Sequence, residues 1–296
     1  MNHNYLKTFL KVAELMNFSQ AAQQLGYSQS TVTIQIQQLE EELGVQLFDR
    51  FGKKVYISQQ GEAFLPFAQK IIKLAMEAQE ALVVQQEPTG VLQVGIVESL
   101  CSTIYQEIIE TFLLRYPKVD LIIKIATTLE LVKLLQQNQV DVIVTLDKKI
   151  NEHNFCRAIE REERIVFLAS KAHPLVYKTH SVSLQDIVCE KFILTEKYCN
   201  YREVFEEILR ERNLAVAARL EIGSTNLIFD LVVKGLGITL LPEICLSYYP
   251  VQQEIAILPI SDCSIKLFTQ LIYNKNNWVS PAKQAFINIT EQYLFP

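Results

Sequence analysis

Two glycines that end consecutive helical patterns near the start of the chain constrain its fold more than any other sequence feature. Ser19 is expected to cap a short helix over residues 20–25, and Gly26 is expected to end it. Ser28 is expected to cap the next helix, which Gly44 ends. Two helices joined by a tight turn that contains glycine predict a helix-turn-helix.

The second of these predicted helices has one apolar and one polar face. Val32, Ile36, Leu39 and Leu43 follow helical spacing and are expected to point inward. The opposite face carries amides and hydroxyls, which can hydrogen-bond to base edges and phosphates in a major groove. An alternative is a polar face that contacts only water. The candidate DNA-contacting residues are Ser28, Gln29, Ser30, Thr31, Thr33, Ile34, Gln35 and Gln38.

Two short strands within residues 48–57 are predicted around a basic tip, which would make this a winged helix-turn-helix. Arg50, Lys53 and Lys54 lie at or beside the tip and are candidate phosphate-binding residues. The whole chain has a formal net charge of −5, so no overall field attracts it to nucleic acid. We therefore expect a local DNA site, and an assembly of two or more copies that adds half-sites.

A long apolar stripe over residues 62–86 predicts a helix, and the apolar face of this helix is too long and too wide for it to be stable alone in water. Either its own domain or a partner helix must cover it. Residues 87–90 then predict a hinge. Beyond the hinge, apolar runs typical of strands alternate with amphipathic helices, which predicts an α/β region. The expected strands cover residues 91–97, 121–126, 140–146, 165–169, 192–195, 218–223, 237–241, 255–258 and 267–273.

Several segments of the N-terminal region carry a resemblance to a known family. They are Phe18-Ser19-Gln20-Ala21-Ala22, residues 25–33, 36–40 and 43–50 and, more loosely, residues 57–61. With these motifs the chain resembles the LysR-type transcriptional regulators, and the resemblance continues over its whole length. The chain departs from the usual residues of the family at Ser30, Thr31 and Ile34 and within residues 58–60. These departures concern the individual base contacts.

The resemblance implies an α+β multidomain fold. It comprises a winged helix-turn-helix at residues 1–60, a linker helix at 61–87, and an α/β effector domain at 88–296 that is similar to periplasmic binding proteins. That domain is expected to have two subdomains, lobe I at about 91–163 with 267–296 and lobe II at about 164–266. The linker helix is expected to join two subunits into a homodimer, and homodimers are expected to pair into a homotetramer. The implied partners are double-stranded promoter DNA, a small-molecule effector in the cleft between the lobes, and RNA polymerase.

Hydroxyl-bearing segments follow three of the expected strands, where helix N-termini of α/β folds offer free N–H groups to anions. Each hydroxyl can equally serve as a helix cap. Ser99 and Thr128 stand at positions that bind the effector in the family. The resemblance therefore implies a small anion, most often a carboxylate, as effector, and no other cofactor. The candidate effector-binding residues are Ser99, Leu100, Ser102, Thr103, Thr127, Thr128, Thr145, Asn200, Arg202, Ser224 and Thr225.

The segment Cys199-Asn200-Tyr201-Arg202 is similar to a stretch found in a subset of these regulators. Arg202 can pair with a carboxylate in the cleft, or it can lie on a helix surface. Lys197 and Arg202 are expected to lower the thiol pKa of Cys199 through their positive charge. Redox sensing through Cys199 is therefore an alternative function, although no cysteine follows it before Cys245 to act as a resolving partner.

Sequence patterns for catalysis or metal binding are missing from the chain. It has no GxGxxG, P-loop, GxSxG or HExxH pattern, and its 4 histidines and 6 cysteines show no metal-ligand spacing. We expect no catalytic residue, no metal and reduced cysteines. No apolar run approaches the roughly 20 residues of a membrane span, and the first residues do not resemble a secretion signal, which indicates a cytoplasmic protein. The sequence favours a ligand-responsive regulator over an enzyme that uses the α/β region, and over an architectural DNA-binding protein without a working sensor.

Overall fold

The computed structural model describes residues 2–51, 54–82, 87–178 and 181–295. The chain divides into two compact units, one of residues 1–85 with 137–139 and the other of residues 86–136 with 140–296. Within the described ranges, no helix is both long and apolar enough to cross a membrane.

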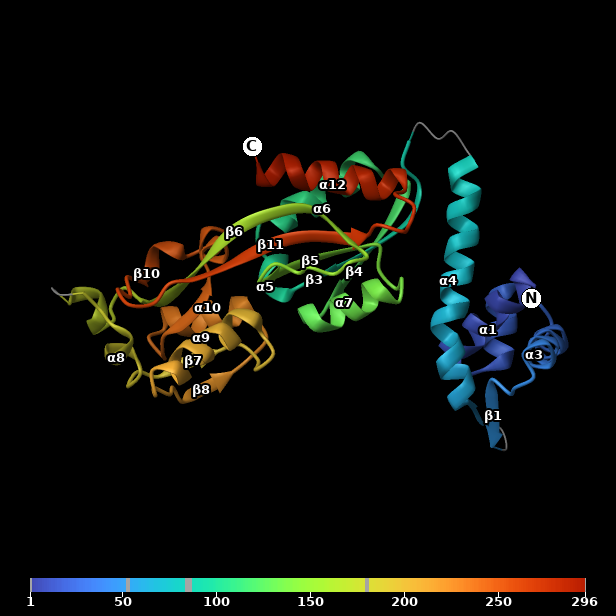
Figure 1. The fold of residues 1–296 in the computed structure, drawn as a ribbon, viewed down its shortest axis with the longest axis horizontal. Coiled ribbons are helices and arrows are strands. Elements are labelled where there is room, and N and C mark those ends of the chain that lie inside the picture. The colour runs from blue at the N-terminus through green and yellow to red at the C-terminus, as the bar shows by residue number, and fades with distance from the viewer. Residues whose placement is uncertain (1, 52–53, 83–86, 179–180, 296) are drawn as a thin grey trace. The chain divides into compact units, whose positions relative to one another are not determined.

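The N-terminal unit is a winged helix-turn-helix, as expected. Its three helices are α1 (His3–Leu15), α2 (Phe18–Leu25) and α3 (Gln29–Leu43), and they pack around a common apolar core (Figure 1). The strands β1 (Phe48–Phe51) and β2 (Lys54–Ile57) follow and pair in antiparallel register. The two short strands around the basic tip are therefore confirmed.

The helix caps of this unit confirm one expectation and correct another. Ser28 caps α3, and its hydroxyl accepts a hydrogen bond from the backbone N–H of Thr31 at 3.1 Å. In contrast, α2 begins before Ser19, and its cap is Asn17, whose side chain accepts bonds from the N–H groups of Ser19 and Gln20 at 3.0 and 3.1 Å. The cap predicted at Ser19 is wrong because Asn17 has the extended backbone that a capping residue requires.

The predicted helix ends and core positions are confirmed in this unit. Gly26 and Gly44 have φ angles of +71° and +69°, a left-handed conformation that glycine adopts without the strain of a Cβ atom. Val32, Ile36 and Leu39 of α3 are fully buried. The sequence thus contained the stop signals and the inward stripe of the helix-turn-helix.

Helix α4 (Gln59–Leu82) is the long helix expected after the wing, and it has two apolar surfaces. Ala68 is buried in the core of the N-terminal unit, with Phe64 and Leu65 packed beside it. Phe67 and Leu74 are instead 63% and 62% exposed. Packing against its own unit therefore covers only part of the apolar stripe.

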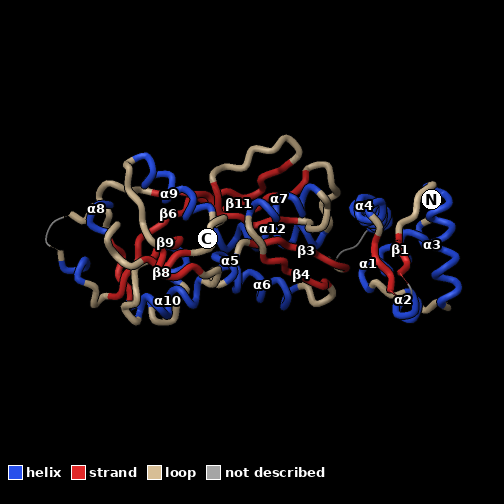
Figure 2. The backbone as a smooth tube through the Cα atoms, turned by 90° about the horizontal axis from the view of Figure 1, so that it is seen from below, coloured by secondary structure: helices blue, strands red, loops and turns tan. Residues whose placement is uncertain are grey.

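The second unit contains all nine expected strands. Seven form one sheet in the order β10-β6-β11-β5-β3-β4, with β9 paired to β6, and the other two, β7 and β8, form a small parallel sheet (Figures 1 and 2). Their bounds are β3 (Gly90–Ile96), β4 (Val119–Ile125), β5 (Val142–Asp147), β6 (Phe155–Ser170), β7 (Phe192–Leu194), β8 (Ala218–Glu221), β9 (Thr239–Pro242), β10 (Ile255–Leu258) and β11 (Ile265–Asn274).

The strand β6 begins at Phe155, well before the expected start at residue 165. Its first half carries a run of charged residues, so it lacks the apolar pattern by which strands are predicted from sequence. Such a run is stable in a sheet when opposite charges on neighbouring strands lie close together. One such pair joins Lys266 of β11 to Glu162 of β6 at 2.7 Å. Since β6 and β11 pair over most of their length, the expected lobe boundaries near 163 and 266 fall inside two continuous strands.

Helices cover both faces of this sheet. Helices α6 (Ile104–Arg115) and α12 (Pro281–Leu294) pack together on one face, and α7 (Thr128–Gln136) lies on the other (Figure 1). Alternate residues of β5 explain this arrangement, since Val142 and Val144 point into one apolar core and Ile143 into another. The remaining helices are α5 (Glu98–Cys101), α8 (Leu184–Ile187), α9 (Asn200–Glu211), α10 (Thr225–Val233) and α11 (Glu243–Ser247), with two short 3-10 helices at Pro174–Tyr177 and Gln252–Glu254.

Candidate functional site

The outward face of α3 is the candidate DNA-contacting surface. Gln29, Ser30, Ile34 and Gln38 are exposed, whereas Thr33 is half-buried. The side chain of Gln38 makes no hydrogen bond to any residue within the described ranges. It is therefore free to contact a base edge without giving up a protein contact.

Several of the other predicted base-contacting side chains already have partners inside the unit. The amide oxygen of Gln29 accepts a bond from the Ser19 hydroxyl at 2.8 Å, and the amide oxygen of Gln35 accepts one from Thr8. The Thr33 hydroxyl donates to the backbone oxygen of Gln29 at 3.0 Å. These contacts orient the side chains and leave their remaining donors and acceptors for DNA.

Three hydroxyls gather at the N-terminus of α3. Ser28 Oγ lies 2.8 Å from both Ser30 Oγ and Thr31 Oγ1. These residues stand at the end of the helix where free N–H groups attract phosphate. The departures of Ser30 and Thr31 from the usual family residues therefore build a hydroxyl cluster at the helix start.

Glu40 fixes the junction between α3 and the wing, a role that sequence reasoning did not find. Its carboxylate accepts hydrogen bonds from the N–H groups of Leu47 and Phe48 at 2.7 and 3.3 Å. The wing residues Arg50 and Lys54 lie on β1 and β2, but their side chains and the whole of Lys53 fall outside the described residues. The available signal in the sequence was an acidic residue directly after Leu39 of the inward stripe, because a carboxylate close to an apolar core needs hydrogen-bond donors.

The second unit contains a pocket of about 260 Å³. Segments at the carboxyl ends of strands line it, namely residues 97–99 after β3, residues within 125–130 at the end of β4, and residues 195–196 and 198–201 after β7. Leu146 and Gly223 complete the lining. This is the place where ligands bind in open α/β sheets.

The structure brings some of the predicted effector residues to this pocket and leaves others elsewhere. Ser99, Thr127, Thr128 and Asn200 line it, and so does Cys199. The predicted residues that do not line it are Leu100, Ser102, Thr103, Thr145, Arg202, Ser224 and Thr225.

Two hydrogen-bonded contacts join opposite sides of the pocket. Asn200 Nδ2 donates to Thr128 Oγ1 at 2.8 Å and to the backbone oxygen of Leu146 at 2.9 Å. The carboxylate of Glu98 accepts bonds from the N–H and hydroxyl of Thr225 at 3.0 and 2.5 Å. The segments after β3 and β4 and the end of β5 are thus linked to the starts of α9 and α10.

Carboxylates of the chain itself cap the helix N-termini where an anionic effector was expected. Glu98 caps α10 through Thr225, and Glu130 accepts bonds from the N–H and hydroxyl of Thr127 at 3.0 and 2.8 Å at the start of α7. Hydrogen bonds from Thr127 hold the pKa of Glu130 below its usual value. Both helix starts therefore already hold a negative charge, which disfavours binding of a further carboxylate there.

Two family patterns match nearly the whole chain. Residues 3–62 match the bacterial regulatory helix-turn-helix of the lysR family, and residues 85–294 match the LysR substrate binding domain. The chain belongs to the LysR family of transcriptional regulators.

Proteins similar to this LysR-type regulator are known over its full length. The uncharacterized HTH-type transcriptional regulator YwqM of Bacillus subtilis is 36% identical, over 99% of each chain. A full-length OxyR variant from Pseudomonas aeruginosa has a similar fold, with a TM-score of 0.76 and 21% identity over 98% of this chain and 95% of that one. CbnR complexed with its target DNA has a TM-score of 0.67 and 20% identity over 99% of this chain and 100% of that one.

Arg202 of this LysR-type regulator lies at the start of α9 and is only 3% exposed. Its guanidinium donates to the backbone oxygen of Thr195, to Glu206 at 2.7 Å and to Glu221 at 3.0 Å. These three acceptors occupy the guanidinium. The structure therefore presents Arg202 as a buried ion-paired residue and not as a cleft cation.

Cys199 precedes α9 and is half-buried in this regulator. Burial raises the pKa of its thiol to about 11. The expected lowering of this pKa is wrong, because the cost of burying a thiolate exceeds the effect of hydrogen bonds to the thiol, and the negative charge of Glu196 raises the pKa further. The Arg202 guanidinium is paired with Glu206 and Glu221.

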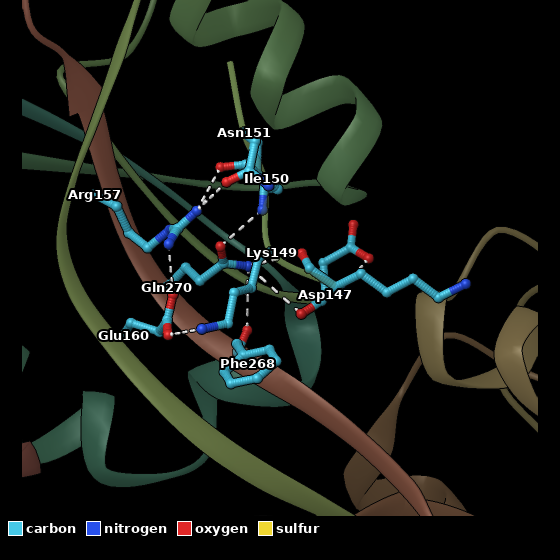
Figure 3. Close-up of polar contacts among 9 residues, drawn as sticks. Asp147, Lys149, Ile150, Asn151, Arg157, Glu160, Phe268 and Gln270 are labelled. Atoms are coloured by element: carbon cyan, nitrogen blue, oxygen red, sulfur yellow. Dashed lines mark hydrogen bonds and ion pairs between the residues drawn. The ribbon is translucent and has the colours of Figure 1, made fainter. Parts of the chain in front are cut away.

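Gln270 of β11 is a fully buried amide that organises the loop after β5, and sequence reasoning did not find it. Its Oε1 accepts from the N–H of Ile150 at 2.9 Å and its Nε2 donates to the backbone oxygen of Lys148 at 3.1 Å (Figure 3). Arg157 of β6 holds the same loop through Ile150 O and Asn151 Oδ1 at 2.9 and 2.7 Å. A lone glutamine inside an apolar strand was the available signal, since a buried amide needs partners.

Proposed function

We propose that α3 recognises a specific DNA sequence, and that a small effector in the pocket changes how the oligomer of this chain binds that DNA. The observation that carries the proposal is the presence of two modules in one chain. One is a winged helix-turn-helix with an exposed polar helix face, and the other is a substrate-binding domain with a pocket at its strand ends. The proposed effector contacts come from the pocket-lining residues Ser99, Thr127, Thr128 and Asn200.

In this proposal the first turns of α3 enter the major groove, and the wing reaches the phosphate backbone. The exposure of Gln29, Ser30 and Gln38 supports base contacts. The basic residues Arg50 and Lys53 supply phosphate contacts on the basis of sequence.

The proposed assembly is a homodimer formed through α4, which pairs further into a homotetramer. Phe67, Ile71 and Leu74 lie on one face of the helix and are 63%, 36% and 62% exposed, an apolar surface that a second copy of α4 would cover. Two or four copies place recognition helices in successive major grooves and compensate for the weak charge of one unit. Promoter-bound copies would then contact RNA polymerase.

Effector and DNA binding are coupled only if the effector binds one arrangement of the pocket more tightly than another. The bonds of Asn200 to Thr128 and of Glu98 to Thr225 join the two sides of the pocket. A ligand that competes with these bonds, or adds to them, changes the relative energies of the two arrangements. Coupling free energies of this kind are typically about 1–3 kcal/mol.

DNA reading is tested by selecting sequences from a random duplex pool with the full-length chain. We expect enrichment of a site with dyad symmetry, and no enrichment would contradict the proposal. On the selected site, Gln38→Ala should weaken binding by about 1–3 kcal/mol while binding to random DNA is unchanged. The control is Gln136→Ala, which removes an exposed amide at the end of α7. An equal loss for Gln38→Ala on both DNAs would remove its base-reading role.

Phosphate contact by the wing is tested with Lys53→Ala. This variant should lower the salt dependence of binding on every DNA sequence, because one fewer counterion is released for each lost phosphate contact. The slope of log Kd against log salt measures the effect. An unchanged slope would show that the wing does not contact phosphate.

Ligand response is tested by measuring the Kd for the selected DNA across a panel of metabolites, with the wild-type chain and with Ser99→Ala. We expect at least one metabolite to change the Kd of the wild type and to change that of the variant less. A Kd that no metabolite alters would instead support an architectural DNA-binding protein.

A further inference from the structure

The pocket is lined by carboxylates from three separate segments. Glu98 follows β3, Glu130 lies in the first turn of α7, and Glu196 follows β7. Within the described part of the chain, no Lys, Arg or His side chain lines the pocket. An effector that enters it therefore meets negative charge on three sides.

The cations nearest in sequence do not offset this charge. Arg202 is paired with Glu206 and Glu221, both outside the lining. Lys197 is exposed outside the lining, and its charge adds to the effect of Arg202 in lowering the pKa of Glu221. Lys133 of α7 is also exposed outside the lining, and its charge lowers the pKa of Glu130 less than the hydrogen bonds from Thr127 do. Among the residues that line the pocket, only the three carboxylates carry charge.

Glu98 and Glu130 are already fixed, and Glu196 remains available. Thr225 and Thr127 each donate two hydrogen bonds that hold the first two carboxylates in place. Glu196 is exposed, and its carboxylate makes no hydrogen bond or ion pair to any residue that the structure describes, although its backbone oxygen accepts a bond from the N–H of Cys199. A fixed pair and a free third carboxylate can together hold a cationic group without rearranging the pocket.

Two further features of the lining point to a ligand beside Glu196. Thr195 is 5% exposed, lines the pocket, and its hydroxyl has no oxygen or nitrogen partner among the described residues, only the Cys199 thiol beside it. A Cβ atom at Gly223 would lie 2.9 Å from Glu196 Oε2, so glycine at this position leaves room for the carboxylate. A thiol is a weak hydrogen-bond partner for a buried hydroxyl, and a donor or acceptor of a ligand would satisfy this hydroxyl better.

We propose that the effector carries a positively charged group, an ammonium or a guanidinium, which Glu196 binds in the field of Glu98 and Glu130. This inference rests on the proposed function, in which the pocket is the effector site. Unpaired carboxylates favour a cation and reject an anion that would have no partner. The pocket thereby selects against the carboxylates that the family resemblance led us to expect.

The test compares three four-carbon probes that differ in charge: putrescine, butanediol and succinate. The full-length chain is heated with each probe, and unfolding is followed by the fluorescence of Trp278, the single tryptophan. We expect putrescine to raise the unfolding temperature in a saturable manner, and butanediol and succinate to leave it unchanged. Stabilisation by succinate, or equal effects of putrescine and butanediol, would overturn the inference.

Matched variants locate the charge that is responsible. Glu196→Gln should weaken the apparent affinity for putrescine about tenfold, because a charge-assisted contact to the ligand is lost. Glu152→Gln removes an exposed carboxylate outside the lining and should leave the affinity unchanged. Equal affinities of both variants would overturn the inference. DNA selection by the same chain does not depend on these outcomes, so failure of the charge inference is distinguished from failure of the proposed function.

Discussion

The carboxylate of Glu98 accepts two hydrogen bonds from Thr225, which lies 127 positions later in the chain. The backbone N–H donates at 3.0 Å and the hydroxyl at 2.5 Å. Thr225 is the first residue of α10, so the negative charge also lies at the positive end of that helix. The contact connects the segment after β3 with the segment after β8 at the edge of the pocket.

Removing the hydroxyl in this contact should destabilise the second unit. Thr225→Val keeps the shape but loses a hydrogen bond to a charged acceptor, which we expect to cost about 1.5–3 kcal/mol. Urea unfolding followed by Trp278 fluorescence measures the change. Thr225→Ser keeps the hydroxyl and is the control, and equal midpoints for the two variants would contradict the role of this bond.

The cap of α2 can be tested by separate substitutions at its two candidate residues. Asn17→Ala removes the acceptor of two backbone hydrogen bonds and should cost about 1 kcal/mol of local stability. Ser19→Ala leaves those bonds intact and should cost less. Amide hydrogen exchange of α2 in the full-length chain reports the difference. Faster exchange in Ser19→Ala than in Asn17→Ala would restore Ser19 as the cap.

Asp147 at the end of β5 predicts a pH dependence of stability. Burial raises its pKa in the folded chain above the usual 3.8, with a further contribution from the negative charge of Glu203. Because the folded state binds this proton more readily than the unfolded state, the contribution of Asp147 to stability falls as pH rises through the two pKa values. Asp147→Asn should therefore stabilise the chain at pH 7, where the wild-type residue is a buried charge.

Urea unfolding at a series of pH values checks the effect of Asp147→Asn. The advantage of the variant should shrink as the pH falls and disappear below about 3.8, where Asp147 is protonated in both states. The backbone N–H of Lys148 bonds to the side-chain oxygen of Asp147, an acceptor that asparagine retains. A variant that is less stable than the wild type at pH 7 would contradict the prediction.

Cys199 should react slowly at neutral pH. Burial raises its pKa to about 11, so the reactive thiolate is scarce at pH 7. Cys189 is exposed and should be alkylated first by iodoacetamide. Peptide mapping by mass spectrometry after graded exposure gives the order of modification. Preferential alkylation or peroxide oxidation of Cys199 would instead support redox sensing.

The N-terminal unit was largely predictable because its signals are local. Gly26 and Gly44 end their helices, Ser28 caps α3, and the stripe from Val32 to Leu39 points inward. Each of these features depends on residues within one or two helical turns. The cap at Asn17 shows the limit, since two neighbouring residues can both cap a helix and only the backbone conformation selects one.

Sequence alone determined the winged helix-turn-helix, the presence and order of the nine strands, and the placing of a pocket after the carboxyl ends of strands, but not the early start of β6 at Phe155. Only the tertiary structure decided that Glu98, Glu130 and Glu196 meet there, and that Arg202 turns away from the pocket to Glu221. Periodicity and capping act between near neighbours, whereas the charge of a pocket depends on contacts between segments far apart in the chain. The sequence therefore indicated where a pocket forms, and the fold set which charge this pocket presents.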